Sequence, residues 1–595
     1  MRGTRARPDA RARAAVLAGV AASFVAAVDL ARLLRPGLLL DPDTAWLLPR
    51  LGLGLAVVAA AAAAGGIAAA AFWLLSRTRL LAARLPPLPL SPAAAALLAA
   101  GALAAGLLVR FLSAAALEIP FLEDEVNLVT PALELTGTSR DFSDSIRPIP
   151  YGRSDPHEMI GVLYLALLRR CLELAGTTVF AIRLPSLLGG ALSLVTGTLL
   201  ARRLLPRGGT ALAALTLAGL RWHLILSFSG WHSILIAPLV DVAALLLLSA
   251  RRRGTRLPAA LAGIAAGIGP HLYLAAWASS AGLLAFCLWP GEGPESRAWR
   301  AARGALFAAG FLLAVAPLFL FDEGRKIPYF GRTARHSVLR EMRIAGSLMP
   351  ALAAAADALP APWLLPDPEG RHDLEGASRL GWIVGLPVAV ALARALCSPR
   401  AELSAVLLTQ AAAAFGAAVA GGQAGHPNGF RFGYLTTWTA MAAGAGALAA
   451  IGLAPPPKAR AATLAALGLL LIAGARGVRE AAVLWPSRHA TFDSFHGEDT
   501  LVGQAAARWQ RYGSVAVEPG LGRSDSTIDT VRRYRLQAGP VSGPGSGPLT
   551  DRASRRFRVA RGGAGAAPGE RVVERVRDAW GREWAIVLGR PADVP

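Results

Sequence analysis

The sequence predicts an all-α polytopic membrane protein that ends in a small C-terminal α/β domain. Hydrophobic residues make up 54% of the 595-residue chain, and charged residues only 17%. The apolar residues form long blocks, near the roughly 20 residues that a helix needs to cross a hydrocarbon core of about 30 Å. Because backbone groups cannot stay unpaired in lipid, these blocks predict helices. After residue 485 the blocks stop, and sequence with mixed charge and ordinary turn residues begins.

Arginine clusters orient the predicted helices, because cytoplasmic loops carry an excess of Arg and Lys. The clusters lie at 2–13, 76–84, 201–207, 251–256, 297–303 and 455–460. All of them are cytoplasmic if about thirteen spans cross the membrane, with the N-terminus inside and the C-terminus outside. The predicted spans are 14–34, 51–75, 93–113, 179–201, 210–227, 233–250, 256–269, 271–289, 304–321, 378–397, 403–420, 432–453 and 462–484.

Two segments leave an alternative open. Residues 1–28 are basic and then apolar, as in a cleaved signal peptide, but the apolar run continues to about residue 34, which favours a retained first helix. The apolar residues of 156–176 are interrupted by Arg169, Arg170 and Glu173, which favours an amphipathic helix along the outer interface. If this segment crossed the membrane instead, the clusters at 201–207 and 251–256 would lie outside.

The chain is predicted to have three parts. Residues 1–92 form a cytoplasmic tail and two extra transmembrane helices, 93–485 the main transmembrane domain, and 486–595 a small soluble exterior domain. Exterior loops of the transmembrane domain are predicted at 114–178, 322–377 and 421–431. Within the last part, the patterns predict a helix at 501–513, strands at 514–519 and 583–589, and a flexible loop at 539–548.

Charge and cysteine content exclude several classes of protein. The formal net charge is +22, but the arginines form short clusters between apolar runs instead of one basic domain, so nucleic-acid binding is not predicted. The three cysteines, Cys171, Cys287 and Cys397, lie in or beside apolar stretches and predict neither a disulfide framework nor a thiolate metal site. No zinc-helix, G-x-S-x-G, Walker or dinucleotide motif stands in a fitting context.

Unusual polar residues collect at the predicted outer face, in the stretches 123–125, 151–158, 221–233, 270–277, 369–376 and 425–434. An ionisable residue at such a place is by default a functional-site hypothesis. The alternative is that the tryptophans form an interfacial belt and that each histidine is structural. Six of the nine histidines lie in these stretches: His157, His223, His232, His271, His372 and His426.

Several segments, in their order, resemble the polytopic GT-C glycosyltransferases. They are "PFLEDEVNLV", "FAIRLPSLLGGALSLVTGTLLARRLLP", "RWHLILSFSGWHSILIAPL", "GIAAGIGPHLYLAAW" and "RHDLEG". Over residues 93–455 the chain is similar to bacterial members of the family of dolichyl-phosphate-mannose protein mannosyltransferases and the lipid A aminoarabinose transferase. The resemblance implies a bundle of transmembrane helices, a sugar donor linked to polyprenyl phosphate, an acceptor reached from outside, and inversion at the anomeric carbon.

The resemblance also implies a catalytic acid pair. The "DE" after the first family helix matches Asp124 and Glu125. Asp124 would be the general base that takes the proton of the acceptor hydroxyl, with Glu125 supporting or substituting for it. The alternative is a solvated loop, or a set of charges at the N-terminus of the helix that follows.

The leaving polyprenyl phosphate would need fixed positive charge, which a guanidinium fork supplies. Arg183 matches the arginine of the family's "R-L-P-S" helix start, Arg431 a late-loop arginine, and Arg371 with His372 a segment in which Asp373 replaces an asparagine. The alternative for each arginine is snorkelling or contact with a lipid headgroup. Further substrate or acceptor-site candidates are Arg153, Asp155, His157, His232, His271, Tyr273, His372 and His426.

Two departures from the family pattern bear on the donor. His232 stands where relatives often have an arginine; if that arginine binds phosphate, the replacement implies a different donor recognition or a weakened site. Asp155 keeps an acidic residue before proline, and with Asp124 it could help to hold a divalent cation. No other cofactor is expected.

The sequence thus predicts a membrane glycosyltransferase of the bacterial plasma membrane, with its active site on the exterior face. The donor would be a polyprenyl-phosphate-linked sugar, and the acceptor a protein, a glycolipid or an envelope polysaccharide. The Ala- and Arg-rich composition is typical of a GC-rich bacterial genome. The alternatives are a non-catalytic transporter or lipid-handling protein, for which an inverted repeat would be expected, and a degenerate relative whose exterior tail binds a partner.

Overall fold

The computed structural model describes most of the chain from residue 85 onward. The described ranges are 85–116, 125–126, 128–134, 149–150, 159–160, 162–291, 295–320, 337–358, 370–371, 373–421, 432–521, 525–534 and 556–590.

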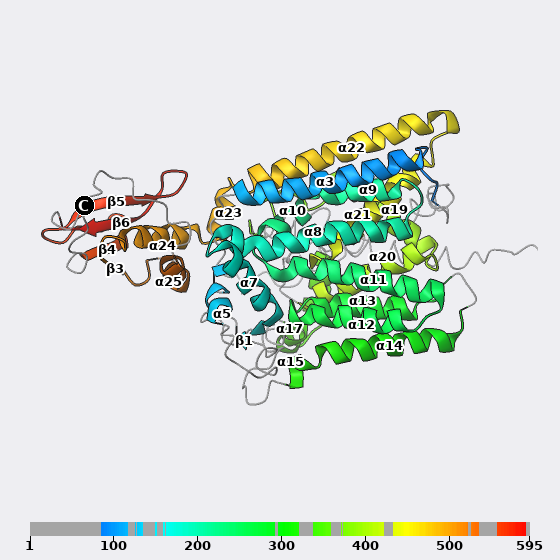
Figure 1. Cartoon of the computed structure of the whole chain (residues 1–595), viewed down its shortest axis with the longest axis horizontal. Helices are drawn as coiled ribbons and strands as arrows, with labels where there is room; N and C mark the ends of the chain where they lie inside the picture. The colour runs from blue at the N-terminus through cyan, green and yellow to red at the C-terminus, as the bar shows by residue number, and fades with distance from the viewer. Residues whose placement is uncertain are drawn as a thin grey trace, which may run out of the picture.

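A bundle of long apolar helices forms the body of the molecule, and its helices run alternately in opposite directions (Figure 1). In the part of the chain that the structure describes, six helical segments are long and apolar enough to cross a membrane, by length and composition. A bent pair is a further candidate span, and four shorter apolar helices accompany them. The helices are α3 (Pro92–Ala116), α8 (Val179–Leu204), α9 (Gly209–Gly219), α10 (Arg221–Phe228), α11 (Ile236–Arg253), α12 (Leu257–Ile268), α13 (Ala276–Leu288), α14 (Arg297–Val315), α19 (Gly381–Cys397), α20 (Glu402–Ala420), α21 (Leu435–Ile451) and α22 (Ala459–Arg479).

Each predicted span from 93–113 onward coincides with one of these helices or with the bent pair α9 and α10. The predicted spans at 14–34 and 51–75 lie outside the described residues, so the total of thirteen stays a prediction. The single helix predicted at 210–227 is instead broken, with a bend of 51° between α9 and α10. Short one-turn helices at 232–235, 269–271 and 456–458 and a π-helical turn at 480–484 join or extend the long helices.

Small residues let neighbouring helices approach closely. A Cβ atom on Gly263 of α12 would lie 2.0 Å from the carbonyl oxygen of Phe307 in α14, and one on Gly310 would lie 2.2 Å from that of Ala260. Backbone atoms cannot move aside as a side chain can. Contacts of this kind drive helix association in a lipid environment, where apolar surface gains little from burial against another helix.

Shorter elements cover the end of the bundle where α8 begins (Figure 1). They are α5 (Val129–Glu134), the antiparallel pair β1 (Ile149–Pro150) and β2 (Met159–Ile160), α7 (Val162–Ala175), α15 (Pro317–Leu320), α17 (Val338–Ala345) and α18 (Met349–Ala358). Helix α7 falls within the segment 156–176 and is not among the candidate spans. It packs Tyr164 and Leu168 against Val126 and Ile182, as an amphipathic surface helix would.

The C-terminal part is a small α/β domain beyond α23 (His489–Ser494), at the same end of the bundle (Figure 1). Its sheet has the order β3-β4-β6-β5, with β3 parallel to β4 and the other neighbours antiparallel. Trp509, Val559 and Val587 lie in a core between helix and sheet. Its elements are α24 (Gly497–Trp509), β3 (Ser514–Val517), α25 (Asp525–Tyr534), β4 (Arg556–Arg561), β5 (Arg571–Arg577) and β6 (Glu583–Gly589).

The predicted helix and both predicted strands of this domain are confirmed as α24, β3 and β6. Strands β4 and β5 were not predicted. Their sequences, "RFRVAR" and "RVVERVR", carry three arginines each and look like charged loops. The predicted loop at 539–548 lies outside the described residues.

Candidate functional site

The structure places part of the predicted site. It describes Glu125, Arg183, His232, His271, Tyr273 and Arg371, whereas the other candidates lie outside the described residues: Asp124, Arg153, Asp155, His157, His372, His426 and Arg431.

Glu125 and Arg183 form a buried, two-pronged ion pair. Oε1 of Glu125 accepts a hydrogen bond from Nε of Arg183, and Oε2 accepts one from Nη2, both at 3.1 Å. The side chains are 0% and 3% exposed. Arg183 lies in the first turns of α8, whose N-cap residue Thr178 accepts a hydrogen bond from the backbone N–H of Ala181. Glu125 is therefore held in place by a cation from a helix that begins more than fifty residues later.

Glu125 also fixes the loop before residue 232. The backbone N–H of Gly230 donates to its Oε1, and a Cβ atom on Gly230 would lie 2.9 Å from the same oxygen, so this close approach requires glycine. Tyr164 donates from its hydroxyl to the carbonyl of Gly230 at 3.0 Å, and Ser186 donates to that of Trp231 at 2.8 Å. The carboxylate thus joins α8 to the "SGWH" loop, and α7 reaches the same loop through Tyr164.

His232 lies among aromatic rings at the end of this loop. Its ring centroid is 5.0 Å from that of Tyr164, 4.9 Å from that of Trp231 and 5.0 Å from that of Tyr273. The structure thus brings together two predicted candidates, His232 and Tyr273. Nδ1 of His232 is buried and has no hydrogen-bond partner among the residues that the structure describes.

His271 has a structural contact. Its Nε2 lies 2.8 Å from the carbonyl oxygen of Ala314, and because a carbonyl only accepts, Nε2 carries the proton. The histidine therefore joins the short helix η3 (Gly269–His271) to α14.

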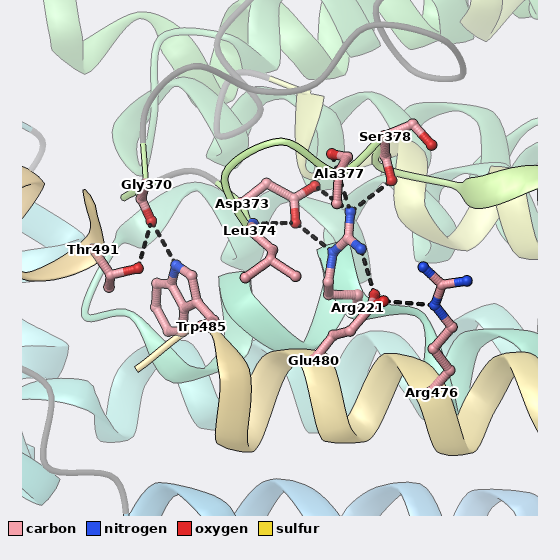
Figure 2. Close-up of polar contacts among 10 residues, drawn as sticks. All are labelled: Arg221, Gly370, Asp373, Leu374, Ala377, Ser378, Arg476, Glu480, Trp485 and Thr491. Carbon is pink, nitrogen blue, oxygen red and sulfur yellow. Dashed lines mark hydrogen bonds and ion pairs between the residues drawn. The ribbon is translucent and has the colours of Figure 1, made fainter. Parts of the chain in front are cut away.

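A second charged cluster, which the sequence analysis did not single out, surrounds Arg221 (Figure 2). Arg221 begins α10, and its Nε donates to Oδ1 of Asp373 at 2.6 Å while Nη1 donates to Glu480. Nη2 donates to the carbonyl of Ser378 at 2.6 Å. Arg476 donates to the other oxygen of Glu480 at 2.6 Å, so two arginines balance two carboxylates.

This cluster anchors the loop that contains Arg371. Asp373 holds one side of it, and on the other side the carbonyl of Gly370 accepts hydrogen bonds from Trp485 at 2.5 Å and from Thr491 at 3.5 Å (Figure 2). Trp485 and Thr491 belong to the segment that leads from α22 toward the C-terminal domain. The backbone at Arg371 is therefore held close to fixed points on either side.

Arg110 accounts for the break between α9 and α10. It is buried, and it donates to the carbonyls of Leu217 and Ala218 at 3.2 Å, where α9 ends. A broken helix leaves its last carbonyls without partners, and a cation at a helix C-terminus favours that arrangement. Nη2 also donates to Nδ1 of His223 at 2.5 Å, since a guanidinium cannot accept.

The polar chain continues from His223 into α8. Because Nδ1 accepts, the proton of a neutral His223 is on Nε2, which lies 2.6 Å from Oγ of Ser193. Ser193 in turn donates to the carbonyl of Gly190 at 3.0 Å. Nearby in the same helix, Thr196 donates to Asp241 at 2.9 Å, and Thr437 of α21 donates to the other oxygen of Asp241 at 2.9 Å. These contacts give the buried polar groups partners within the bundle.

The sequence contained a signal for the buried arginines Arg110 and Arg221. Arg110 falls inside the predicted span 93–113 and Arg221 inside 210–227, and a charge within a span is expensive unless it is paired. Apart from the carbonyl of Gly106, which accepts from Arg110 within α3, their partners could not be identified from local pattern, because they lie more than a hundred positions away.

Among the described residues, no group of three or more His, Cys, Asp or Glu side chains could hold a metal ion. Asp124 and Asp155, the residues to which a divalent cation was assigned, both lie outside that part of the chain.

No protein-family model and no curated protein matches the chain. Among solved structures, ArnT from Cupriavidus metallidurans has a TM-score of 0.46 and 14% sequence identity, both in the apo state and bound to undecaprenyl phosphate. Each of these matches covers 83% of this chain and 97% of ArnT. The archaeal oligosaccharyltransferase AglB from Archaeoglobus fulgidus, in complex with an inhibitory peptide and a dolichol-phosphate, has a TM-score of 0.41 and 16% identity. That match covers 76% of this chain and 61% of AglB. The likeness to each of these structures is distant, with TM-scores below 0.5 and sequence identities of at most 16%.

Proposed function

We propose that this protein is a membrane glycosyltransferase that moves a sugar from a polyprenyl-phosphate donor to an acceptor hydroxyl outside the bacterial plasma membrane. The observation that carries the proposal is the buried pair of Glu125 and Arg183. It fixes the residue that directly follows Asp124 against a helix start that carries an arginine.

In the proposed reaction the acceptor oxygen attacks the anomeric carbon from the face opposite the phosphate. The new C–O bond forms as the bond to the phosphate oxygen breaks, and the phosphate leaves with that electron pair. Asp124 takes the proton of the hydroxyl, a role that contributes about 10²- to 10⁴-fold to the rate. The configuration at the anomeric carbon is inverted.

Glu125 acts in this proposal as a positioning residue. Its two oxygens are occupied by Arg183 and by the N–H of Gly230, so it orients the arginine and the "SGWH" loop and does not take the proton itself. Removing one partner of a buried ion pair typically costs about 3–5 kcal/mol. Glu125 and Arg183 therefore stay paired, and their positions in the site are fixed.

The donor phosphate is proposed to contact Arg183, Arg371 and Arg431. Support for Arg371 comes from the loop around it, which is tied down through Gly370 and Asp373. A preset arginine can bind a phosphate with little loss of side-chain freedom. A divalent cation at Asp124 and Asp155 remains part of the proposal, tested by transfer with and without a chelator.

The first experiment measures sugar transfer in membranes supplied with polyprenyl-phosphate-linked sugars. Asp124→Asn should lower the transfer rate by about 10²- to 10⁴-fold at an unchanged amount of protein in the membrane. Glu173→Gln is the matched control, because Glu173 is a carboxylate on α7 that pairs only with the neighbouring Arg169 and Arg170 among the described residues. Transfer by Asp124→Asn at the wild-type rate would rule out Asp124 as the base.

A second experiment identifies the donor. Mass spectrometry of lipid that co-purifies with Asp124→Asn should find a polyprenyl phosphate that carries a sugar, and the mass of the sugar would name its class. If the wild type transfers no sugar from any such donor and co-purifies with none, the protein is a transporter or lipid-handling protein instead.

A further inference from the structure

The end of the bundle opposite the C-terminal domain contains a cavity of about 870 Å³. The last turns of α8, α11 and α19 and the first turn of α20 line it, and these helix ends lie on the right in Figure 1. Arg183 of the proposed glycosyltransferase site, which pairs with Glu125, lies in the first turns of α8, at the other end of that helix. The cavity is therefore a separate feature.

Arginines outnumber carboxylates in the lining. Arg251, Arg394 and Arg400 line the cavity together with Glu295 and Glu402. Both carboxylates are already neutralised by arginines outside the lining. Glu295 forms an ion pair with Arg303, and Glu402 forms one with Arg252 at 2.6 Å. The cavity as a whole is thus positively charged.

Arg251 is positioned to bind an anion. Its Nη2 makes a long contact of 3.5 Å with the carbonyl of Trp289, and its guanidinium lies 4.9 Å from the ring centre of Phe286. Its Nη1 is buried and has no hydrogen-bond partner in the part of the chain that the structure describes. A buried donor without a partner costs about 1–3 kcal/mol, more when it is charged, so a small movement of the guanidinium that brings it to an oxyanion in the cavity would be favourable.

The other walls of the cavity are apolar. Leu204, Leu205, Leu403 and Leu407 belong to the lining, so a ligand with both an anionic group and a hydrocarbon part would match it. The same end carries Arg202 and Arg203 of α8 and Arg251 and Arg252 of α11, in their last turns. Such basic pockets between membrane helices are suited to anionic lipid headgroups.

We propose that this cavity binds the phosphate headgroup of an anionic membrane phospholipid. Arg251 and Arg400 donate to the phosphate oxygens, and the leucine walls contact the acyl chains. The site lies at the end of the bundle predicted to be cytoplasmic, so the lipid would come from the inner leaflet, and the binding is independent of sugar transfer.

The test uses the full-length protein in a neutral detergent and native mass spectrometry, with dioleoyl phosphatidylglycerol as the probe. The double variant Arg251→Gln with Arg400→Gln should bind this lipid about 10-fold more weakly than the wild type, as expected for the loss of one or two charge-assisted hydrogen bonds. The matched control is Arg253→Gln with Arg297→Gln, which removes two exposed arginines from the same end of the bundle. It should retain wild-type binding within about 2-fold, because neither Arg253 nor Arg297 lines the cavity.

Three results would overturn the proposal: equal binding of zwitterionic dioleoyl phosphatidylcholine, equal weakening in the control, or unchanged binding in the double variant. Displacement of phosphatidylglycerol by millimolar inorganic phosphate would also overturn it and indicate a site for free phosphate. If the double variant does not fold, Arg400→Gln alone keeps the test decisive, because Arg400 is exposed and packs into no core. A shift in its lipid binding would support the proposal, and its absence would contradict it.

Discussion

Two ion pairs between arginine and a carboxylate, one in the helical bundle and one in the C-terminal domain, differ in how far they are buried. In the bundle, Arg221 is 6% exposed and its partner Asp373 is fully buried. In the C-terminal domain, Arg558 is 37% exposed and its partner Glu570 is 21% exposed. Water and salt screen the second pair and not the first. The difference implies that a buried arginine such as Arg221 is a determinant of folding, whereas an exposed one such as Arg558 contributes little to stability.

The largest effect is expected at Arg221. Arg221→Met leaves Asp373 and Glu480 buried without their shared cation and should lower the free energy of unfolding by about 3–5 kcal/mol. Combining it with Asp373→Leu and Glu480→Leu removes the uncompensated charges and should restore much of that loss. The unfolding transition in detergent measures both. A single variant that unfolds like the wild type would show that burial does not make this arginine important.

Close helix contacts in the bundle should give the next largest effect. Gly310→Ala places a methyl group 2.2 Å from the carbonyl oxygen of Ala260, so α12 and α14 must separate. Overpacking of this kind costs about 1–3 kcal/mol. Gly416→Ala is the control, because no atom lies within 4 Å of the added methyl group. It should be neutral or slightly stabilising, since alanine favours helix more than glycine does. Equal behaviour of the two variants would contradict this packing.

A smaller effect should appear on acidification of the C-terminal domain. Burial opposes ionisation of Asp578, but hydrogen bonds from Arg582, Trp584 and Trp580 outweigh it and hold the pKa of this carboxyl below its ordinary value of 3.8. The stabilisation is thus present above pH 3.8 and is lost as the pH falls through the lower pKa of the folded state.

Hydrogen exchange of β6, corrected for the intrinsic exchange rate, measures this loss. Wild-type protection should fall as the pH drops below 3.8. Asp578→Asn should be less protected at pH 5 and nearly insensitive to pH in the lower range. If the variant and the wild type lose protection in parallel, another carboxyl is responsible.

The long apolar helices from α3 onward were predictable from sequence, because their length and apolarity are visible there. The break between α9 and α10 was not, because it depends on Arg110 from α3, which meets the freed carbonyls of Leu217 and Ala218. Strands β4 and β5 were missed because each carries three arginines among few apolar residues, and the pairing that identifies them involves β6, further along the chain.

The candidate site was predictable only as a set of residues. The sequence assigned Glu125 to supporting or substituting for Asp124 in proton transfer and Arg183 to phosphate binding, as if they acted separately. The structure pairs them, and it adds Gly230 as a donor to the same carboxylate. Local pattern cannot show a contact between residues 58 positions apart, so the coupling of these two roles came from the fold alone.

The smallest effect is expected at Arg558. Its Nη2 lies 3.0 Å from Oε2 of Glu570, an oxygen that also accepts from the backbone N–H of Ala567 at 3.0 Å. Arg558→Gln therefore leaves Glu570 with a partner and with water, and the free energy of unfolding should change by no more than about 0.5 kcal/mol. Arg303→Gln is the counterpart in the bundle, because Arg303 is 1% exposed and pairs with Glu295. In the same unfolding assay it should be clearly destabilising. Equal changes in the two variants would mean that burial does not separate the two regions.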